Sequence, residues 1–382
     1  MLDDASALVG ALWGVPFIAL VPLARRRPDV AEQPREGARS ISVIVPARNE
    51  SATIDTVLHS VLASTHQAFE IIVVDDRSTD DTADQVRRLA GTDPRLRLVP
   101  GAPLPTGWFG KPWACHQGAA VATGEFLLFT DADTTHHPEL LSHAVGGLLA
   151  EQADLLTLTS HQQCQSFWER LVMPQIWLLL GVRYVPERIN RATRPDQVVA
   201  NGQFILIRRT AYDSLGGHEA VQGEVVEDLA LAQHAFAAGC RIRMMFGERL
   251  LATRMYRSLG AMVEGWSKNL YVGSRQSLGG HPRLTPLAPF AVMAAFAFWL
   301  VPPLLLALGV LPQAMLVASG CSLMFWALIA YGMGIPLRYA FGYPIGALLA
   351  LGIMVRSTVR GRRHIVWKGR AYGTTPGDGV VT

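Results

Sequence analysis

The chain has 382 residues, of which half are hydrophobic and only 17% are charged, against about 25% charged residues in an average soluble domain. The formal net charge is +3, so the chain has no strong basic field of the kind that attracts nucleic acid. The length allows more than one domain. The four cysteines are scattered and form no Cys-x-x-Cys pair, which indicates reduced residues in a cytoplasmic or membrane setting.

The N-terminal part carries an uncharged run that is long enough to span a bilayer. Residues 5–24 contain no charged residue, and a spanning helix needs about 20 mostly apolar residues. One alternative is a cleaved signal peptide, but Asp3 and Asp4 stand where a signal peptide carries positive charge. We therefore interpret the run as an uncleaved anchor. Three arginines follow at 25–27 and favour the cytoplasmic side, so the polar middle of the chain is expected in the cytoplasm.

A second set of uncharged segments lies near the C-terminus. Residues 284–337 are long enough for two spans, with a break expected at 309–313, where Gly, Pro and Gln cluster. Residues 339–355 suffice only for a short span or a re-entrant segment. The basic tail that follows favours the cytoplasm, so we expect one of these segments to be re-entrant or interfacial. The basic residues of the tail are Arg356, Arg360, Arg362, Arg363, Lys368 and Arg370.

Strands and helices alternate through the polar middle of the chain. This alternation predicts an α/β fold with a mostly parallel sheet that helices cover on both faces. The expected strands are residues 41–45, 70–74, 96–99, 125–129, 154–159 and 203–207, and the expected helices are residues 51–64, 80–89, 114–122 and 228–238. Residues 171–182 form an apolar run that is too short to span. It fits either a buried core helix or a helix at the membrane surface.

Two of the expected strands end in carboxylates. Asp75 and Asp76 follow one strand, and Asp131 and Asp133 follow another. In an open α/β sheet, ligands bind just beyond the carboxyl ends of the strands, so these four side chains are expected in one crevice. Their mutual repulsion requires a cation, and a divalent metal with a phosphorylated ligand satisfies this arrangement.

The turn after the first strand lacks the glycines of a dinucleotide-binding site. No Gly-x-Gly-x-x-Gly follows Val45, and no Gly-x-x-x-x-Gly-Lys-[Ser/Thr] occurs in the chain. These two absences argue against NAD chemistry and against P-loop ATP chemistry.

Four acidic or loop motifs occur in a fixed order: Ser42-Val-Ile-Val-Pro-Ala-Arg-Asn-Glu50, Val74-Asp-Asp-Arg-Ser-Thr-Asp-Asp-Thr82, Asp131-Ala-Asp133 and Gly223-Glu-Val-Val-Glu-Asp228. From about residue 41 to residue 268, the chain resembles the family 2 glycosyltransferases, which are inverting enzymes of the GT-A fold that use nucleotide-diphospho-sugars. Further segments are similar to the membrane-bound branch that glycosylates carotenoid acids, and to its relatives that act on ceramide and hopanoid lipids. These segments are Asn201-Gly-Gln-Phe204, Arg254-Met-Tyr256, Glu264-Gly-Trp-Ser-Lys-Asn269 and Val366-Trp-Lys-Gly-Arg370.

The resemblance implies a binding site for the sugar donor. Asp76 would accept a hydrogen bond from the base, although a solvated turn is the alternative for the whole acidic stretch, with Asp80 capping the next helix. Lys111 would neutralise the diphosphate, and its alternative is a surface lysine. The nucleoside pocket would be shaped by Pro46, Ala47, Arg48 and Glu50.

The resemblance also assigns a metal site and a catalytic base. Asp131 and Asp133 fit Mg²⁺ or Mn²⁺, since hard cations choose carboxylate oxygens and bridge to phosphate, and Asp131 also faces the donor. Asp228 is the candidate general base, with Glu227 beside it; the alternative for this pair is an interaction with the helix dipole. Acidic neighbours repel, which raises the pKa of one of them.

Two histidines after the acidic motif are less promising. His136 and His137 are candidate metal ligands by residue type, but a soluble loop is the preferred interpretation.

Three residues are assigned to the acceptor or diphosphate side, namely Arg257, Trp266 and Lys268. They occupy the region where processive polysaccharide synthases of this superfamily carry Gln-x-x-Arg-Trp. No Arg-Trp pair occurs in the chain, which favours transfer of a single sugar. Trp266 fits either a ring that stacks on sugar or acceptor, or an interfacial aromatic.

Together, these inferences predict a membrane-bound glycosyltransferase at the cytoplasmic face of the cell membrane. It would move one sugar from a nucleotide-sugar, UDP-linked on resemblance alone, to a carotenoid, hopanoid or ceramide-like lipid. The alternatives are a processive polysaccharide or polyprenyl-phosphate transferase and a non-catalytic nucleotide-sugar-binding protein. The expected ranges are an anchor at 1–27, a linker at 28–39, the GT-A domain at 40–283, a transmembrane region at 284–355 and a basic tail at 356–382.

Overall fold

The structure is a computed structural model that describes residues 4–20, 28–276, 283–361, 365–367 and 370–372. Its contacts divide the chain into two units. The sheet unit comprises Arg27–Gln163, Pro186–Met255 and Arg362–Thr382, and the helical unit comprises Met1–Arg26, Cys164–Val185 and Tyr256–Gly361. The division differs from the expected ranges, because two segments of the predicted 40–283 domain belong to the helical unit. The arginines at 25–27 and Arg362, Arg363 and Lys368, on which the predicted orientation depends, lie outside the described residues.

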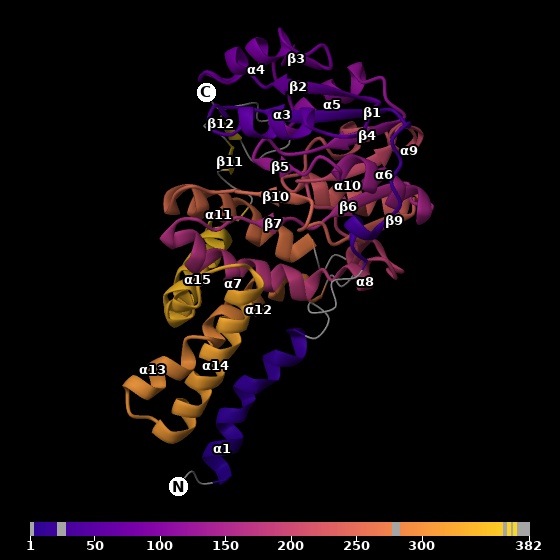
Figure 1. The fold of residues 1–382 in the computed structure, drawn as a ribbon. Coiled ribbons are helices and arrows are strands. Elements are labelled where there is room, and N and C mark those ends of the chain that lie inside the picture. Colours follow the sequence, from indigo (N-terminus) through magenta and orange to yellow (C-terminus); the bar gives the residue numbers. More distant parts are fainter. Residues whose placement is uncertain (1–3, 21–27, 277–282, 362–364, 368–369, 373–382) are drawn as a thin grey trace. The chain divides into compact units, whose positions relative to one another are not determined.

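A seven-stranded sheet forms the centre of the sheet unit, with the strand order β3-β2-β1-β4-β8-β6-β9 (Figure 1). Strands β1 to β4 run parallel, as do β6 and β9, while β8 is antiparallel to both of its neighbours. The predicted α/β architecture with a mostly parallel sheet is therefore confirmed. The strands are β1 (Ile41–Ala47), β2 (Phe69–Asp75), β3 (Leu96–Pro100), β4 (Phe126–Phe129), β6 (Leu155–Leu158), β8 (Ile205–Arg208) and β9 (Ile242–Met245).

Helices pack on both faces of this sheet because successive strand residues point to opposite sides. Val43 and Val45 of β1 share a buried cluster with residues of α3 and α6, whereas Ile44 points toward α5. The longer helices are α3 (Ile54–Leu62), α4 (Thr82–Ala90), α5 (Gly110–Val121), α6 (Leu140–Ala150) and α10 (Glu227–Ala237). Shorter ones are α8 (Pro186–Ile189), α9 (Arg209–Ser214), η2 (Val30–Glu32), η3 (Pro195–Gln197) and η4 (Gly217–Val221).

The order in which the chain adds strands to the sheet reverses at β1. The chain adds β2 and β3 on one side of β1 and then crosses to place β4 on its other side. Ligands bind at such a switch point, beyond the carboxyl ends of the strands. The residues that follow β1, β2 and β4 therefore share one edge of the sheet.

A second, three-stranded sheet supports the segment after β4. It consists of β5 (Thr134–His136), β10 (Leu251–Thr253) and β7 (His161–Gln162), in the order β5-β10-β7. The sequence analysis did not predict these strands, since each has only two or three residues. The expectation that His136 lies in a soluble loop is wrong, because His136 is on β5 and only 4% exposed.

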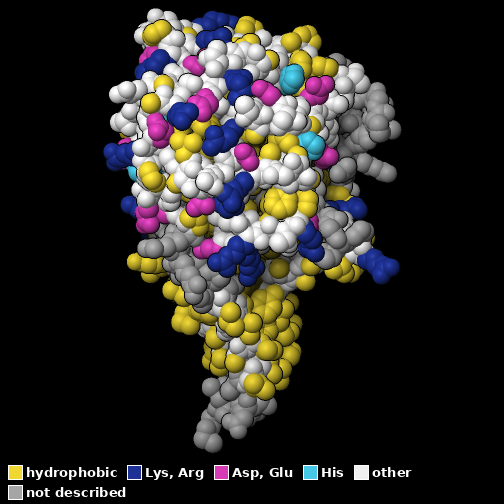
Figure 2. All heavy atoms as spheres, turned by 90° about the vertical axis from the view of Figure 1, so that its right-hand side faces the viewer, with side chains coloured by type: hydrophobic (Ala, Val, Ile, Leu, Met, Phe, Trp, Pro, Cys, Tyr) yellow, Lys and Arg dark blue, Asp and Glu magenta, His cyan; other side chains and the backbone are white. Residues whose placement is uncertain are grey.

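The helical unit exposes much more apolar surface than the sheet unit. Val121 is the only exposed large hydrophobic side chain of the described sheet unit, and all the others lie in the helical unit. Figure 2 shows hydrophobic side chains gathered over these helices. The elements are α1 (Asp4–Ala11), η1 (Leu12–Ala19), α7 (Phe167–Arg183), α11 (Leu259–Gln276), η5 (Thr285–Leu287), α12 (Ala288–Phe298), α13 (Val301–Ala307), α14 (Pro312–Gly332), η6 (Leu337–Gly342) and α15 (Tyr343–Arg360). A short hairpin of β11 (Ile365–Trp367) and β12 (Arg370–Tyr372) follows.

Two helical segments among the described residues are long and apolar enough to cross a membrane, namely α14 and Leu337–Arg360. A third crossing arises if Thr285–Phe298 and Val301–Ala307, which are bent by 50°, count as one span. The predicted break at 309–313 is confirmed, because α13 ends at Ala307 and α14 begins at Pro312. The run at 339–355 is part of a 24-residue segment, longer than its uncharged length indicated. The N-terminal anchor stays a prediction, since the apolar helix there spans only Leu8–Ile18.

The apolar run at 171–182 lies within α7 of the helical unit. Ser166 and Glu169 form a capping box that starts this helix. The first half of α7 is buried. It lies close to α15 because Gly346 has no side chain; any side chain there would collide with the carbonyl of Leu171. Phe167, at the start of α7, is exposed. The helix thus combines a buried half with exposed apolar residues.

We predict that Gly118→Ala destabilises the sheet unit by about 1–3 kcal/mol, the usual cost of overpacking a core. A methyl group there would lie 2.5 Å from Cγ2 of Ile44, where α5 packs against β1. Gly91→Ala is the matched control, because its methyl group would meet no atom closer than 3.4 Å. Thermal unfolding of the two variants measures the difference. Equal melting temperatures would contradict the packing described here.

Candidate active site

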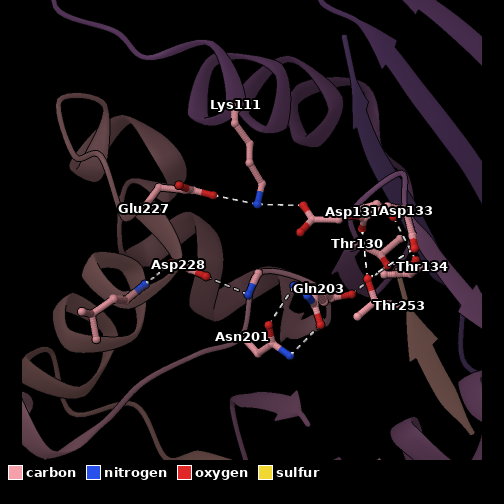
Figure 3. A network of polar contacts seen from close by, with 12 residues as sticks. Lys111, Thr130, Asp131, Asp133, Thr134, Asn201, Gln203, Glu227, Asp228 and Thr253 are labelled. Carbon is pink, nitrogen blue, oxygen red and sulfur yellow. Dashed lines mark hydrogen bonds and ion pairs between the residues drawn. The ribbon is translucent and has the colours of Figure 1, made fainter. Parts of the chain in front are cut away.

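One ammonium group joins three elements at the carboxyl edge of the sheet (Figure 3). Lys111 Nζ lies 2.7 Å from Oδ1 of Asp131 and 2.8 Å from Oε1 of Glu227. Lys111 belongs to the first turn of α5, Asp131 follows β4, and Glu227 begins α10. The predicted donor-side lysine and two of the predicted acids are therefore brought together, and the surface-lysine alternative is wrong, since the Lys111 side chain is only 22% exposed.

Lys111 keeps its positive charge because its pKa is raised. Burial by itself lowers the pKa of a lysine, but the negative charges of Asp131, Glu227 and Asp228 outweigh burial and raise the pKa of Lys111 well above its usual value. Lys111 therefore stays protonated at every pH at which the protein is handled. Cys115, one helical turn away and buried, has a raised pKa, mainly because of burial, and is a thiol rather than a thiolate.

The site raises the pKa of Asp228. Burial and the neighbouring charge of Glu227 raise the pKa of Asp228 to about 6, although Lys111 and two backbone N–H groups oppose the shift. The backbone N–H of Gly202 donates to Oδ2 at 2.8 Å, and that of Leu229 donates to Oδ1 at 2.8 Å. Both carboxylate oxygens are therefore oriented, and the group can gain or lose a proton near neutral pH.

Gly202 is a site residue to which the sequence analysis gave no role. A methyl group at this position would lie 2.9 Å from Oδ2 of Asp228 and 2.9 Å from Nζ of Lys111. Only a residue without a side chain lets the backbone N–H come this close to the acid. The signal was present, because Gly202 lies in the quoted segment Asn201-Gly-Gln-Phe204, but the contact joins residues far apart in sequence.

The loop that carries Asp131 and Asp133 is fixed by the three-stranded sheet. Thr253 Oγ1 donates to Oδ1 of Asp133 at 3.3 Å, and the backbone N–H of Arg254 donates to the Asp133 carbonyl at 3.2 Å. Thr253 pairs with Thr134 across β10 and β5, so the acidic loop leads directly into this small sheet. Thr253 was not predicted as a site residue.

A buried polar network continues behind the acidic loop. Thr130 Oγ1 donates to the carbonyl of Gln203 at 2.8 Å and lies 3.1 Å from Nε2 of His136. Burial lowers the pKa of His136 to about 3, so the ring is neutral. The network links the end of β4 to the Asn201–Gly202 loop and is structural in character.

The donor set of Asp131 and Asp133 suits a hard cation in part. Their carboxylate oxygens are the ligands that Mg²⁺ and Mn²⁺ prefer. In the described part of the chain, however, no group of three or more His, Cys, Asp or Glu side chains is arranged to hold a metal. A cation at these two acids would therefore take its other ligands from a bound phosphate, and Asp131 would have to share its charge with Lys111.

The residues predicted to bind the nucleoside come from two adjacent loops that are joined by hydrogen bonds. Arg48 Nη1 donates to the carbonyl of Asp76 at 2.5 Å, and the backbone N–H of Asp76 donates to the carbonyl of Ala47 at 2.8 Å. Pro46 and Ala47 end β1, and Glu50 donates its backbone N–H to Thr82. Asp76 is fully buried, so the solvated-turn alternative is wrong for this residue.

Asp80 is not the N-cap of α4 as expected, because that position is Asp81, but its side chain accepts the first N–H of the helix. Its carboxylate accepts the backbone N–H of Thr82, the first residue of α4, and that of Ser51. Burial raises its pKa, but hydrogen bonds from Thr82 and Ser51 together lower it to about 2.

The predicted acceptor-side residues lie in the helical unit. Trp266 of α11 is only 5% exposed and packs between the rings of Trp177, at 6.4 Å, and Tyr256, at 6.1 Å. Arg257 and Lys268 belong to the same unit. Their role toward an acceptor stays a prediction.

We predict that the Asp228 carboxyl titrates with a midpoint near pH 6, because burial and Glu227 disfavour its charged form. Difference infrared spectroscopy between wild type and Asp228→Asn isolates the carboxyl band of this residue. Below the midpoint the band of the protonated acid appears, and above it the carboxylate bands replace it. A midpoint near 4, the ordinary value for aspartate, would contradict the described environment.

Comparison with known proteins shows what this part of the chain is similar to. Residues 42–216 match the sequence model described as Glycosyl transferase family 2. The 4,4'-diaponeurosporenoate glycosyltransferase of Staphylococcus aureus (strain MRSA252) is 27% identical over 269 residues, which are 69% of this chain and 66% of the relative. The enzyme of the same name from Staphylococcus haemolyticus is 27% identical over 72% of this chain and 73% of its own length.

Structural comparison agrees with this match at the level of fold. The mannosyltransferase PcManGT from Pyrobaculum calidifontis, solved in complex with GDP-Man and Mn²⁺, superposes with a TM-score of 0.55. The sequence identity is 20%, and the match covers 94% of this chain and 98% of that one. The order of motifs, the strand order and the match over residues 42–216 lead to one conclusion. Residues 42–216 of this chain are similar to glycosyl transferase family 2, and the fold is similar to that of a solved mannosyltransferase.

Proposed function

We propose that the protein is an inverting glycosyltransferase that moves a single sugar from a nucleotide-diphospho-sugar to a lipid at the cytoplasmic face of the cell membrane. The observation that carries the proposal is the cluster at Lys111. An ammonium group stands among carboxylates at the switch point of the sheet, beside an acid whose pKa is about 6. Such a site suits a phosphorylated donor on one side and removal of a proton on the other.

The donor would lie along the ends of β1, β2 and β4. Pro46, Ala47, Arg48, Glu50 and Asp76 would surround the nucleoside, which we take to be uridine on resemblance alone. Lys111 would exchange a carboxylate oxygen for a phosphate oxygen as the diphosphate enters. Asp131 and Asp133 would hold Mg²⁺ or Mn²⁺, which neutralises charge on the leaving diphosphate.

Asp228 would take the proton from an acceptor hydroxyl as that oxygen attacks the anomeric carbon. A single displacement breaks the bond to the diphosphate and inverts the configuration, so it needs no enzyme nucleophile. With a pKa of about 6, Asp228 is deprotonated over protonated by roughly ten to one at pH 7. The transfer rate to a hydroxyl should therefore rise with pH up to about 6 and then level off.

The helical unit and the relatives both support a lipid as the acceptor. The exposed apolar side chains of α14 and α15 suit a bilayer or a lipid tail. The relatives are named for a carotenoid acid, so we propose a carotenoid, hopanoid or ceramide-like acceptor. Arg257, Trp266 and Lys268 would lie on the acceptor or diphosphate side.

The testing experiment is transfer in native membranes. Full-length protein, Mn²⁺, labelled nucleotide-sugars and total lipid are combined for wild type, Asp133→Ala and Asp228→Asn. We expect a labelled lipid from wild type and a loss of at least 100-fold in Asp133→Ala, since the diphosphate loses its countercharge. Binding of UDP without labelling by any donor would contradict transfer and favour a binding protein.

The same assay distinguishes two kinds of acceptor. A hydroxyl must lose its proton during attack, so Asp228→Asn should then be as defective as Asp133→Ala. A carboxylic acid arrives already deprotonated, so Asp228→Asn should then keep most of its activity. An acceptor hydroxyl that is still glycosylated by Asp228→Asn would contradict the role of this residue as the base.

Gly202→Ala should lower kcat about 100-fold with little change in the donor KM, because its methyl group displaces Asp228 from its aligned position. Gly37→Ala is the matched control, since no atom lies within 4 Å of its methyl position. Steady-state kinetics with the identified donor and lipid measure both constants. Unchanged kcat in Gly202→Ala would show that the contact does not position the base.

A further inference from the structure

A patch of exposed and half-buried aromatic and arginine side chains lies where α7 meets η6 in the helical unit. Tyr339 is at its centre: Nη1 of Arg170 donates to the tyrosine Oη at 3.1 Å, and the Arg170 guanidinium lies 5.1 Å from the ring centroid. The Arg338 guanidinium lies 5.7 Å from the same centroid, and the Phe167 ring lies at 5.9 Å. We name as the aromatic–arginine patch the residues Phe167, Trp168, Arg170, Arg338, Tyr339 and Phe341.

Neither arginine of the patch is paired with a carboxylate in the described part of the chain. Arg170 donates through Nε to the carbonyl of Cys164, and the exposed Arg338 contacts the ring of Tyr339 and hydrogen-bonds its hydroxyl. Glu169 is the nearest acid in sequence, but it is 2% exposed and accepts the backbone N–H groups of Gln165 and Ser166. The patch therefore presents two positive charges without a matching negative charge.

The patch borders apolar surface that is long enough to enter a bilayer. The candidate span α14 ends at Gly332, and Arg338 follows after a short turn. Leu337 and Phe341 on η6 and Ile345 on α15 are exposed, so the apolar surface continues from this turn into α15. Aromatic and basic residues at the end of an apolar span are typical of the membrane–water boundary, where the phospholipid headgroups lie.

We propose that the aromatic–arginine patch binds the phosphate of an anionic phospholipid headgroup at the edge of the bilayer. Guanidinium groups hold phosphate oxygens through paired N–H donors, which suits the unpaired Arg170 and Arg338. Phe167, Trp168 and Phe341 rest at the level of the headgroups, with their rings against the upper acyl chains. The proposal rests on the membrane location in the proposed function and is independent of sugar transfer.

Binding of short-chain lipids to the full-length protein in neutral detergent tests the proposal. The probes are dioctanoyl phosphatidylglycerol, dioctanoyl phosphatidylcholine and inorganic phosphate. Wild type should bind phosphatidylglycerol more tightly than phosphatidylcholine. Arg170→Gln combined with Arg338→Gln should weaken phosphatidylglycerol binding about 30-fold, or about 2 kcal/mol, while Arg170→Lys with Arg338→Lys keeps most of it.

The matched control removes two exposed arginines of the sheet unit, Arg88→Gln with Arg191→Gln, and should leave lipid binding unchanged. Arg338→Gln alone serves if the double variant does not fold, because Arg338 is exposed and its removal leaves the core intact, and it should weaken binding about fivefold. A preference for phosphatidylglycerol that survives loss of both arginines would overturn the proposal. Equal binding of inorganic phosphate would do so too, because it would indicate a free anion rather than a lipid. Loss of sugar transfer with intact lipid preference would affect only the proposed function.

Discussion

The candidate site depends on one constraint: a single, largely buried ammonium group balances the negative charge of several carboxylates. Lys111 lies within 2.8 Å of both Asp131 and Glu227, and its charge also acts on Asp228. Three acids in a largely buried space repel each other strongly, and leaving one of them without a partner typically costs 3–5 kcal/mol. From the start of α5, Lys111 thus links the end of β4 to the start of α10, and these three elements define the site.

The features around Lys111 follow from this constraint. Since one positive charge does not satisfy three negative ones, Asp228 remains partly uncompensated, and its pKa of about 6 suits a proton acceptor near neutral pH. Gly202 supplies a backbone N–H in place of a second cation and can do so only because it has no side chain. In the proposed function, a diphosphate that draws Lys111 away would shift this balance and would thereby couple donor binding to the protonation of Asp228. The small sheet of β5, β10 and β7 keeps the acidic loop in register with the cluster.

The parts of the fold that depend on local patterns could be predicted from the sequence, and the parts that depend on distant contacts could not. β-branched runs located β1 and β2, and the acids after β2 and β4 indicated the edge of the sheet that carries the cluster. Strands β5, β7 and β10 escaped prediction because two or three residues show no periodicity. The contacts that join α7 and α11 to the helical unit are also between residues far apart in sequence, and composition does not reveal them. Gly202 and Thr253 act through contacts with residues far away in sequence.

The measurement that tests this account most directly is the infrared titration of the Asp228 carboxyl in Lys111→Met, with Lys111→Met/Asp228→Asn as the reference. Because Lys111 lowers the pKa of Asp228, its removal should move the midpoint clearly above that of wild type. The measurement does not require the donor or the acceptor to be known. A midpoint equal to or below that of wild type would show that Lys111 does not control the protonation of Asp228, and would contradict the central claim.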